Sequence, residues 1–203
     1  MAIFTGSGFD WVQLLEVSDT SSEYETEHII SWNEYVESGT VTEGTYMIYI
    51  CYTQATVDGT TSLNTQNASP SFQMMNQGTA LPTTFFTISW HNGFNWTYNS
   101  TESSATAQRF FSGTNPTFPS TLHSVVVRME LRLEVGNCAY RGQVVGPICP
   151  DKGRPIQGYF HGRVHDYTNL PTNMRLFTFT SSIGSDVYFP RCVASAYRMN
   201  TSW

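Results

Sequence analysis

Apolar and polar residues alternate in short segments along most of this 203-residue chain. Within 121–135, Val127 and Met129 alternate with Arg128 and Glu130. Because successive residues of a strand point to opposite faces, this spacing predicts a sheet with one buried and one wet face, as in antiparallel sheets. Segments of this kind predict strands at 11–18, 26–36, 44–55, 83–94, 121–135, 157–168, 173–182 and 186–199.

The arrangement of these segments predicts an all-β fold. No segment carries a helical stripe of ten or more residues, and turn-rich stretches separate the apolar ones. Many short strands with such spacing are typical of an antiparallel β-sandwich or barrel. No linker or repeat divides the chain, so one domain over 1–203 is expected. Two stretches rich in Thr, Ser, Asn, Gly and Pro, 56–82 and 95–120, are expected as long loops, which are usually functional or mobile.

Composition agrees with a β protein and restricts its partners. Charged residues make up 13% of the chain, about half the usual share. The net charge is −6, Lys152 is the only lysine, and arginines form only small groups at Arg128/Arg132 and Arg154/Arg163. Nucleic-acid binding needs clustered cations, so no nucleic-acid partner is expected.

Targeting features are absent from the sequence. No apolar run approaches the roughly 20 residues of a membrane-spanning helix. The start "MAIFTGSGFDW" has neither the basic residues nor the apolar stretch of a signal peptide. The chain is therefore expected to be either an ectodomain whose signal was removed or a protein that reaches its destination without one.

Cysteines and sequons point weakly to an oxidising compartment. Cys51, Cys138, Cys149 and Cys192 fit no C-x-x-C metal or redox pattern. Their even number and wide spacing favour disulfides, with free buried thiols as the alternative. Asparagines in N-x-S/T sequons are formal glycosylation acceptors. They are Asn67, Asn95, Asn99 and Asn200, of which Asn95 and Asn99 are the candidate sites.

No catalytic or metal site is predicted, and no cofactor. His161 and His165 lie four residues apart, which on a strand separates them by roughly 13 Å, too far to share one zinc ion. Serines near glycines do not form a G-x-S-x-G elbow, and no phosphate-binding glycine loop occurs. The carboxylate pair Glu130/Glu134 alternates with cations, as on a solvated face. A non-enzymatic protein is therefore expected.

A series of short motifs resembles the tumour necrosis factor ligand superfamily and the related complement globular heads. The segment "GTYMIY" resembles the third core strand of that family. Further along come Cys138 and Cys149, then "HGRVHDYTNLPTNMRLFTFTS", and then "DVYF" at 186–189. The order of the motifs matches the family, whereas Pro190 stands where the family has glycine, and 95–120 is longer than the family's loop.

The resemblance implies a jelly-roll sandwich that forms a homotrimer and clusters a cysteine-rich protein receptor outside the cell. Receptor contacts would then fall on loops 56–82 and 95–120. It also implies disulfides Cys51–Cys192 and Cys138–Cys149. The aromatic residues that it places on the three-fold axis are Tyr49, Phe160 and Tyr188.

The alternation in 44–55 independently predicts self-association. Tyr46, Ile48 and Ile50 would face the core, which leaves Met47 and Tyr49 on the outer face of a central strand. An apolar outer face of this kind needs a cover, which a second copy supplies.

Two other functions fit the same pattern. The alternative is a viral coat or surface subunit with a jelly-roll fold, located on the virion. The strand, turn and strand rhythm of "MELRLEVGNCAYRGQVVGPICP" favours this alternative. The absence of a basic arm for packaging nucleic acid counts against it. The third candidate is a lectin, because "WHNGFNWTYN" combines aromatic and amide side chains.

Overall fold

The computed structural model describes most of the chain with gaps between the strands. The described residues are 10–19, 27–31, 43–56, 63–64, 68–81, 83–91, 96–105, 108–109, 117–118, 123–134, 138–149, 154–164, 170–180 and 187–200.

Nearly all of these residues belong to β-strands. In chain order the strands are β1 (Asp10–Asp19), β2 (Glu27–Ser31), β3 (Gly44–Thr56), β4 (Leu63–Asn64), β5 (Ala68–Asn76), β6 (Thr79–Ala80), β7 (Thr83–His91), β8 (Trp96–Ala105), β9 (Gln108–Arg109), β10 (Thr117–Phe118), β11 (His123–Leu133), β12 (Ala139–Cys149), β13 (Arg154–Val164), β14 (Asn173–Thr180) and β15 (Val187–Asn200). The all-β prediction is confirmed.

The strands form an antiparallel jelly-roll sandwich. The large sheet has the order β1-β15-β3-β11-β12-β13-β7-β8, and the small sheet has the order β2-β14-β5-β6, with β9 also paired to β5. The chain alternates between the sheets from β1 to β2, β3 and β5, and later from β11 through β14 to β15. This interleaving is the double Greek-key path of a jelly roll. The strands β12, β13, β7 and β8 extend the large sheet beyond β11.

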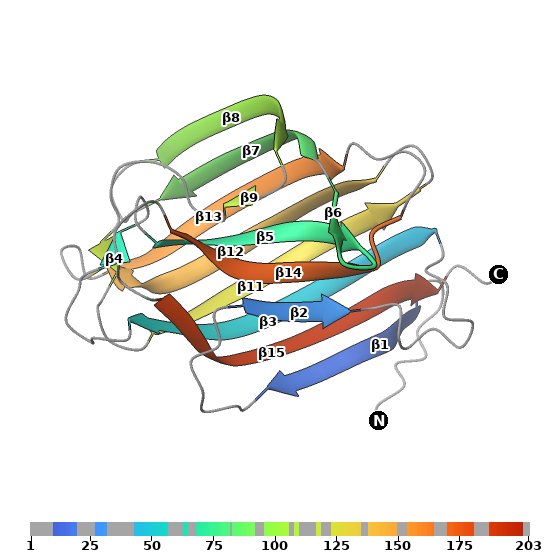
Figure 1. Cartoon of the computed structure of the whole chain (residues 1–203), viewed down its shortest axis with the longest axis horizontal. Coiled ribbons are helices and arrows are strands. Elements are labelled where there is room, and N and C mark those ends of the chain that lie inside the picture. The colour runs from blue at the N-terminus through green and yellow to red at the C-terminus, as the bar shows by residue number, and fades with distance from the viewer. Residues whose placement is uncertain are drawn as a thin grey trace.

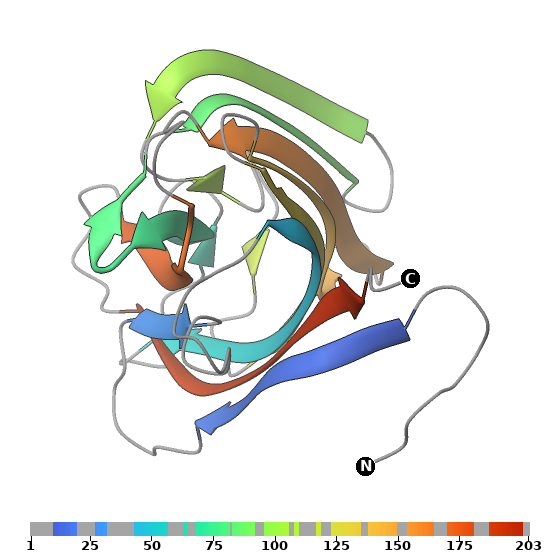
Figure 2. The ribbon, with the colours of Figure 1, turned by 90° about the vertical axis from the view of Figure 1, so that its right-hand side faces the viewer.

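The large sheet curves around the small one. Figure 1 shows β2, β14 and β5 lying in front of the large sheet. The view in Figure 2 shows the large sheet bent into an arc, with β1 at one end, β8 at the other and the small sheet on its concave side. Among the described strands, none forms a second layer on the convex face of the large sheet.

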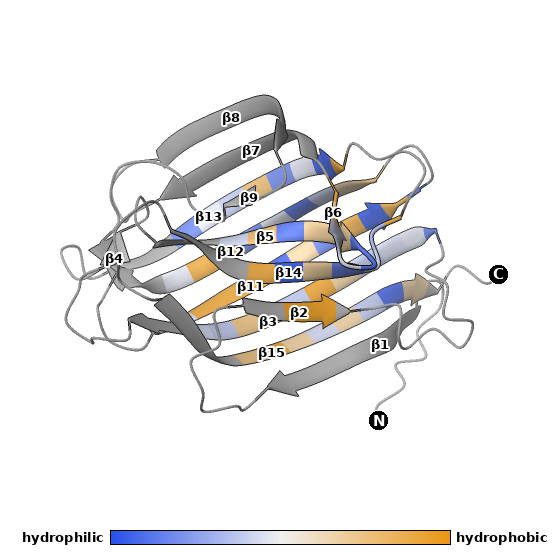
Figure 3. Cartoon of the chain, viewed as in Figure 1, coloured by the Kyte–Doolittle hydropathy of each residue, from blue (hydrophilic) through white to orange (hydrophobic). Residues whose placement is uncertain are grey.

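The core fills the space between the two sheets. Alternate residues of β3, β11 and β15 are buried between the sheets, and hydrophobic residues recur along the described parts of these strands (Figure 3). Tyr46, Ile48 and Ile50 of β3 are buried, as the alternation predicted. The buried hydrophobic residues of β11 are Val125, Val127, Met129, Leu131 and Leu133.

An aromatic cluster joins the sheets near β12. The ring of Phe160 lies 5.5 Å from that of Phe72, and the ring of Tyr140 lies 5.3 Å from that of Phe72. Gly142 pairs directly with Phe160, and a Cβ atom at Gly142 would lie only 2.3 Å from the Phe160 ring and 2.6 Å from the Arg128 carbonyl oxygen. Glycine is therefore required where the ring crosses β12.

The connection between β5 and β6 is a two-residue turn. Asn76 pairs with Thr79, and between them Gln77 has φ of 45° and Gly78 has φ of 87°. Positive φ at both central residues is the requirement of the type I′ turn, which matches the twist of an antiparallel hairpin.

Three segments differ from the sequence prediction. Residues 56–82, expected as a loop, contain β5, which pairs with β14 in the interior of the small sheet. Residues 95–120, also expected as a loop, contain the ten-residue strand β8. Strand β12 was not among the eight expected alternating segments, but the second strand in the strand, turn and strand rhythm that favours the viral alternative lies within it. Cross-strand pairing, rather than local hydrophobicity, holds these polar or glycine-containing segments extended.

Candidate binding face

The convex face of the large sheet carries a patch of exposed apolar side chains over its central strands. In the cross-strand register, Cys51 of β3 lies between Val126 of β11 and Val193 of β15. Val126 is 48% exposed and Val193 is 42% exposed, and Cys51 is also exposed. The next row along β3 contains Tyr49, which is 40% exposed. We call Tyr49, Cys51, Val126 and Val193 the central patch.

Aromatic and cationic contacts hold one side of this patch in place. The rings of Tyr49 and Tyr197 meet edge to face, with centroids 6.0 Å apart and planes at 83°. The guanidinium carbon of Arg128 lies 5.9 Å from the centre of the Tyr49 ring. These three residues line a shallow hollow of about 550 Å³ together with Met47 and Ser195. Tyr49 is thus oriented by its neighbours while part of its ring faces solvent.

A larger hollow lies beside the central patch, over β11, β12 and β13. Its volume is about 840 Å³. The register sets its outward residues in three cross-strand rows: Arg128, Gln143 and Tyr159; Glu130, Arg141 and His161; Arg132, Ala139 and Arg163. We call this feature, which these nine residues and Met47 line, the arginine hollow.

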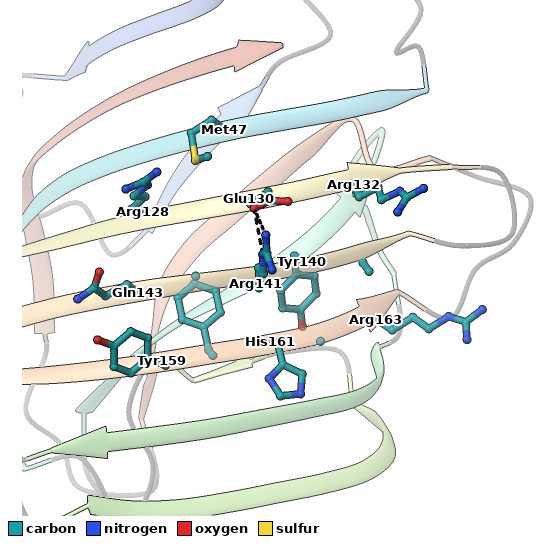
Figure 4. A pocket seen from close by; sticks show the side chains of 14 residues that line it. Met47, Arg128, Glu130, Arg132, Tyr140, Arg141, Gln143, Tyr159, His161 and Arg163 are labelled. Atoms are coloured by element: carbon teal, nitrogen blue, oxygen red, sulfur yellow. Dashed lines mark hydrogen bonds and ion pairs between the residues drawn. The ribbon is translucent and has the colours of Figure 1, made fainter. Parts of the chain in front are cut away.

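Ion pairs arrange part of the arginine hollow. Arg141 donates from Nε at 3.0 Å and from Nη2 at 2.7 Å to the same Glu130 oxygen. Arg132 donates from Nε at 2.7 Å to Glu134, which follows β11. Figure 4 shows Arg141 directed to Glu130 across the middle of the hollow, Arg132 and Arg163 at one end, and Arg128 and Gln143 toward the other. These exposed pairs contribute little to stability but they fix where the guanidinium groups lie.

The structure separates the predicted axis residues. Tyr49 and Met47 lie on the outer face, as the alternation predicted. Phe160 is only 2% exposed and faces the core, so its assignment to an oligomer interface is wrong. The sequence of this strand indicates the inward orientation of Phe160, because polar Tyr159, His161 and Arg163 alternate with it. Tyr188 lies on β15, but its side chain is outside the described residues.

The expected Cys51–Cys192 disulfide is also wrong. Cys192 pairs with Tyr52, and Val193 pairs with Cys51, so the two cysteines are offset by one residue on neighbouring strands. Cys192 is buried on the inner face, whereas Cys51 is exposed on the outer face. Side chains on opposite faces of a sheet cannot reach disulfide geometry.

The expected Cys138–Cys149 disulfide fails for a different reason. Cys138 directly precedes the 11-residue strand β12, and Cys149 is the last residue of that strand. The ends of such a strand are roughly 33 Å apart, whereas bridged cysteines have Cα atoms about 4.4–6.8 Å apart. Cys138 is a buried thiol in no disulfide, and its Sγ lies 3.2 Å from the Glu134 carbonyl oxygen. Buried thiols at Cys138 and Cys192 match the alternative kept open on sequence grounds.

The two candidate glycosylation sites and one histidine of the predicted pair are not among the residues whose side chains are described. Asn95 and His165 are outside the described residues, and Asn99 lies on β8 with its side chain undescribed. Among the described residues, no group of three His, Cys, Asp or Glu side chains is placed to hold a metal ion. Nor does the described part of the chain contain a helix long and apolar enough to cross a membrane.

The arginine hollow could be predicted only in part from the sequence. Arg128 and Arg132 were visible as a pair, and Arg163 as part of another. Arg141 joins them only because β12 lies between β11 and β13. The signal that was available is the alternation of Arg141 and Gln143 with Tyr140 and Val144.

Comparisons with known proteins identify no family. No protein-family model matches the chain, and no curated protein matches it. A search of solved structures gives the CBM2 module of the evolved Dit of Lactobacillus casei BL23 phage J-1. That likeness has 9% sequence identity and a TM-score of 0.25 over 100% of this chain and 81% of the other. A score this low carries no argument about this protein, so its function has to be argued from the face described above.

Proposed function

We propose that this protein is a non-enzymatic assembly subunit that associates with further copies of itself through the central patch, as part of a viral coat or surface structure. The observation that carries the proposal is the row of exposed Val126, Cys51 and Val193 beside Tyr49 on central strands. Exposed apolar groups at the middle of a sheet, rather than at its edge or in a loop, are typical of a surface that a partner covers.

The composition of the patch suits a protein interface. Interface centres are depleted in charge and enriched in tyrosine, methionine and arginine. Tyr49, Met47 and Arg128 are residues of these three types, and they line the same shallow hollow. The edge-to-face contact with Tyr197 holds the Tyr49 ring in place before association. Preordered aromatic side chains lose little conformational entropy on binding, which supports association through this patch.

Strands within the two segments that were expected to be receptor-binding loops support the viral assembly class. Strands β5 and β8 occupy much of the two segments that a receptor ligand would present. The structure also contradicts three features that the resemblance to the tumour necrosis factor family implied, namely the two disulfides and the place of Phe160 on the three-fold axis. A jelly-roll subunit that assembles through sheet faces does not depend on any of these features.

A trimeric extracellular ligand stays the second candidate because of one observation. The Cys51–Cys192 disulfide that the resemblance implied does not form, but it required the third core strand and the last strand to be neighbours, and β3 pairs with β15 along most of its length. Both candidates require self-association, and they differ in what the copies build.

Sedimentation velocity at micromolar concentration tests the shared requirement. We expect wild-type protein to be oligomeric and Tyr49→Glu to be a folded monomer, because the substitution removes a central tyrosine and puts a carboxylate into an interface that excludes water. Loss of a central tyrosine alone typically costs about 2 kcal/mol or more, which weakens association by at least about 30-fold. Tyr159→Glu is the matched control, since Tyr159 is 45% exposed on the same sheet but outside the central patch. A monomeric wild type, or equal disruption by the two variants, would refute the interface.

Electron microscopy of the wild-type oligomer separates the two candidates. Closed shells or extended lattices support the viral assembly subunit, whereas discrete trimers support the ligand. Maleimide labelling of Cys51 gives a second readout of the same interface, because this thiol is exposed in one copy and would be covered in the assembly. We expect slow labelling in wild type and fast labelling in Tyr49→Glu.

A further inference from the structure

The arginine hollow concentrates positive charge on an acidic protein. It is lined by four arginines and one glutamate, and Glu134 at its end accepts a hydrogen bond from Arg132, so these six residues carry a formal charge of +2, whereas the whole chain carries −6. The rest of the protein is therefore strongly acidic, and the hollow is a local site for an anion rather than part of a basic surface.

The rows of the register place different groups around the hollow. At one end Arg132 and Arg163 flank Ala139, whose small side chain leaves room between the two guanidinium groups. At the other end Tyr159 and Gln143 lie beside Arg128. One end is therefore cationic, and the other offers an aromatic face with an amide donor and acceptor (Figure 4).

We propose that the arginine hollow binds an acidic oligosaccharide, whose carboxylate or sulfate groups are held by the arginines and whose sugar ring stacks on Tyr159. Guanidinium groups bind planar carboxylates and sulfates through paired hydrogen bonds. The Tyr159 ring is 45% exposed on the rim, and hydroxyl groups find donors and acceptors in Gln143 and His161. The volume of about 840 Å³ lies within the usual range for small-ligand sites, which is enough for a few sugar rings.

The charge distribution favours a short anionic sugar over nucleic acid. A long polyanion would extend from the hollow across acidic surface, and nucleic-acid affinity depends on many phosphate contacts along a basic track. A short oligosaccharide instead places its charge only at the arginines. The hollow meets the central patch at Arg128, which contacts Tyr49, but most of its lining belongs to β12 and β13. The proposal is therefore tested at Arg163 and Tyr159 rather than at the shared residue.

Titration calorimetry with the full chain tests the proposal. The probes are sialyllactose, which carries a carboxylate, and a heparin tetrasaccharide, which carries sulfates; lactose is the neutral control, and sodium sulfate and a DNA tetranucleotide test the anion alone. We expect binding of at least one acidic sugar at least about tenfold tighter than lactose, and a weakening with added salt because ionic contacts are screened. Absence of binding, equal binding of lactose, or tighter binding of sulfate alone or of DNA would overturn the proposal.

Two variants locate the site and one controls for charge. Arg163→Gln and Tyr159→Ser should each weaken the binding of the acidic sugar by about tenfold, the usual size of one charged hydrogen bond or one stacking contact. Arg175→Gln removes the same charge from β14 of the small sheet, where Arg175 contacts Gln73, and should leave binding unchanged. Equal losses in Arg163→Gln and Arg175→Gln would show a general charge effect and refute the site.

Folding and assembly are measured alongside binding. Circular dichroism and sedimentation should show that Arg163→Gln and Tyr159→Ser keep the wild-type fold and oligomeric state. If Arg163→Gln does not fold, the Tyr159→Ser and Arg175→Gln pair decides the proposal, because Tyr159 is an exposed rim residue. Loss of oligomers in Tyr49→Glu with retained sugar binding would confirm that the two surfaces act independently.

Discussion

The close contact between β12 and Phe160 gives the sharpest test of the register that builds the binding face. We consider Gly142→Ala. The new Cβ atom would lie 2.3 Å from the Phe160 ring and 2.6 Å from the Arg128 carbonyl oxygen. Ordinary carbon contacts are about 3.5–4.0 Å, so the shortfall exceeds about 1 Å. The carbonyl is sheet backbone and the ring is packed in the core, so neither can move freely.

The expected loss follows from two opposing effects. Overpacking costs about 1–3 kcal/mol, and displacement of the Phe160 ring weakens its contact with Phe72, which is worth about 0.5–1.5 kcal/mol. Replacing glycine in a strand returns about 0.5–1 kcal/mol of backbone entropy. We therefore expect Gly142→Ala to lower the free energy of unfolding by about 2 kcal/mol.

Urea unfolding at fixed protein concentration, followed by tryptophan fluorescence and circular dichroism, measures this loss. With an m value of about 3 kcal/mol/M, the midpoint should fall by about 0.7 M. Adding Phe160→Leu should recover part of the loss, so the double variant should be more stable than the sum of the single effects by about 1 kcal/mol.

Gly78→Ala is the control for Gly142→Ala. Its Cβ would have no atom within 4 Å, but φ of 87° is unfavourable for alanine. It should destabilise through backbone strain alone, and Phe160→Leu should not rescue it. A Gly142→Ala protein as stable as wild type, or a rescue of both glycine variants alike, would mean that β12 and β13 do not pair in this register.

Three further predictions follow from the described core and turns. Burial, and secondarily the charge of nearby Cys192, raises the pKa of Tyr52 well above its usual value of 10.0. Tyr52 therefore keeps its proton in the folded state, and the free energy of unfolding should fall as the pH rises above the unfolded pKa of about 10. In Tyr52→Phe the slope of the unfolding free energy against pH above 10 should be shallower, and an unchanged slope would contradict the assignment. Gln77→Asn should raise the free energy of unfolding by less than about 1 kcal/mol, and so the urea midpoint slightly, because asparagine tolerates the positive φ of 45° better. A lower midpoint would argue against the type I′ turn. Non-reducing peptide mapping should find no Cys138–Cys149 bond, and its presence would rule out an extended β12.

Local alternation was enough to predict much of the fold. In β3 and β11 the period of two fixed which residues face the core, because a strand has only two faces and one of them is covered. The same rule left Tyr49 on the outer face. Strands β5 and β8 were missed because their polar residues resemble a loop, and only their partners β14 and β7 show that they are paired.

The candidate site was less accessible from the sequence. The sequence predicted Tyr49 of the central patch and Met47 beside it on the outer face, whereas Val126 and Val193 could not be added without the pairing of β3 with both neighbours. The family resemblance misplaced Phe160 and the disulfides, because motif order does not fix which face a residue occupies. A single bulge or a shift of one residue moves a side chain to the other face.

The sequence by itself determined that the chain forms strands, which residues of β3 and β11 are inward, and that the protein is acidic with few cations. Those properties depend on neighbours along the chain and on composition. The tertiary structure alone decided that β3 lies between β11 and β15, which puts Cys51 between Val126 and Val193 in one exposed row. Strand order depends on contacts between residues far apart in the chain, and no local pattern records which distant strands will pair.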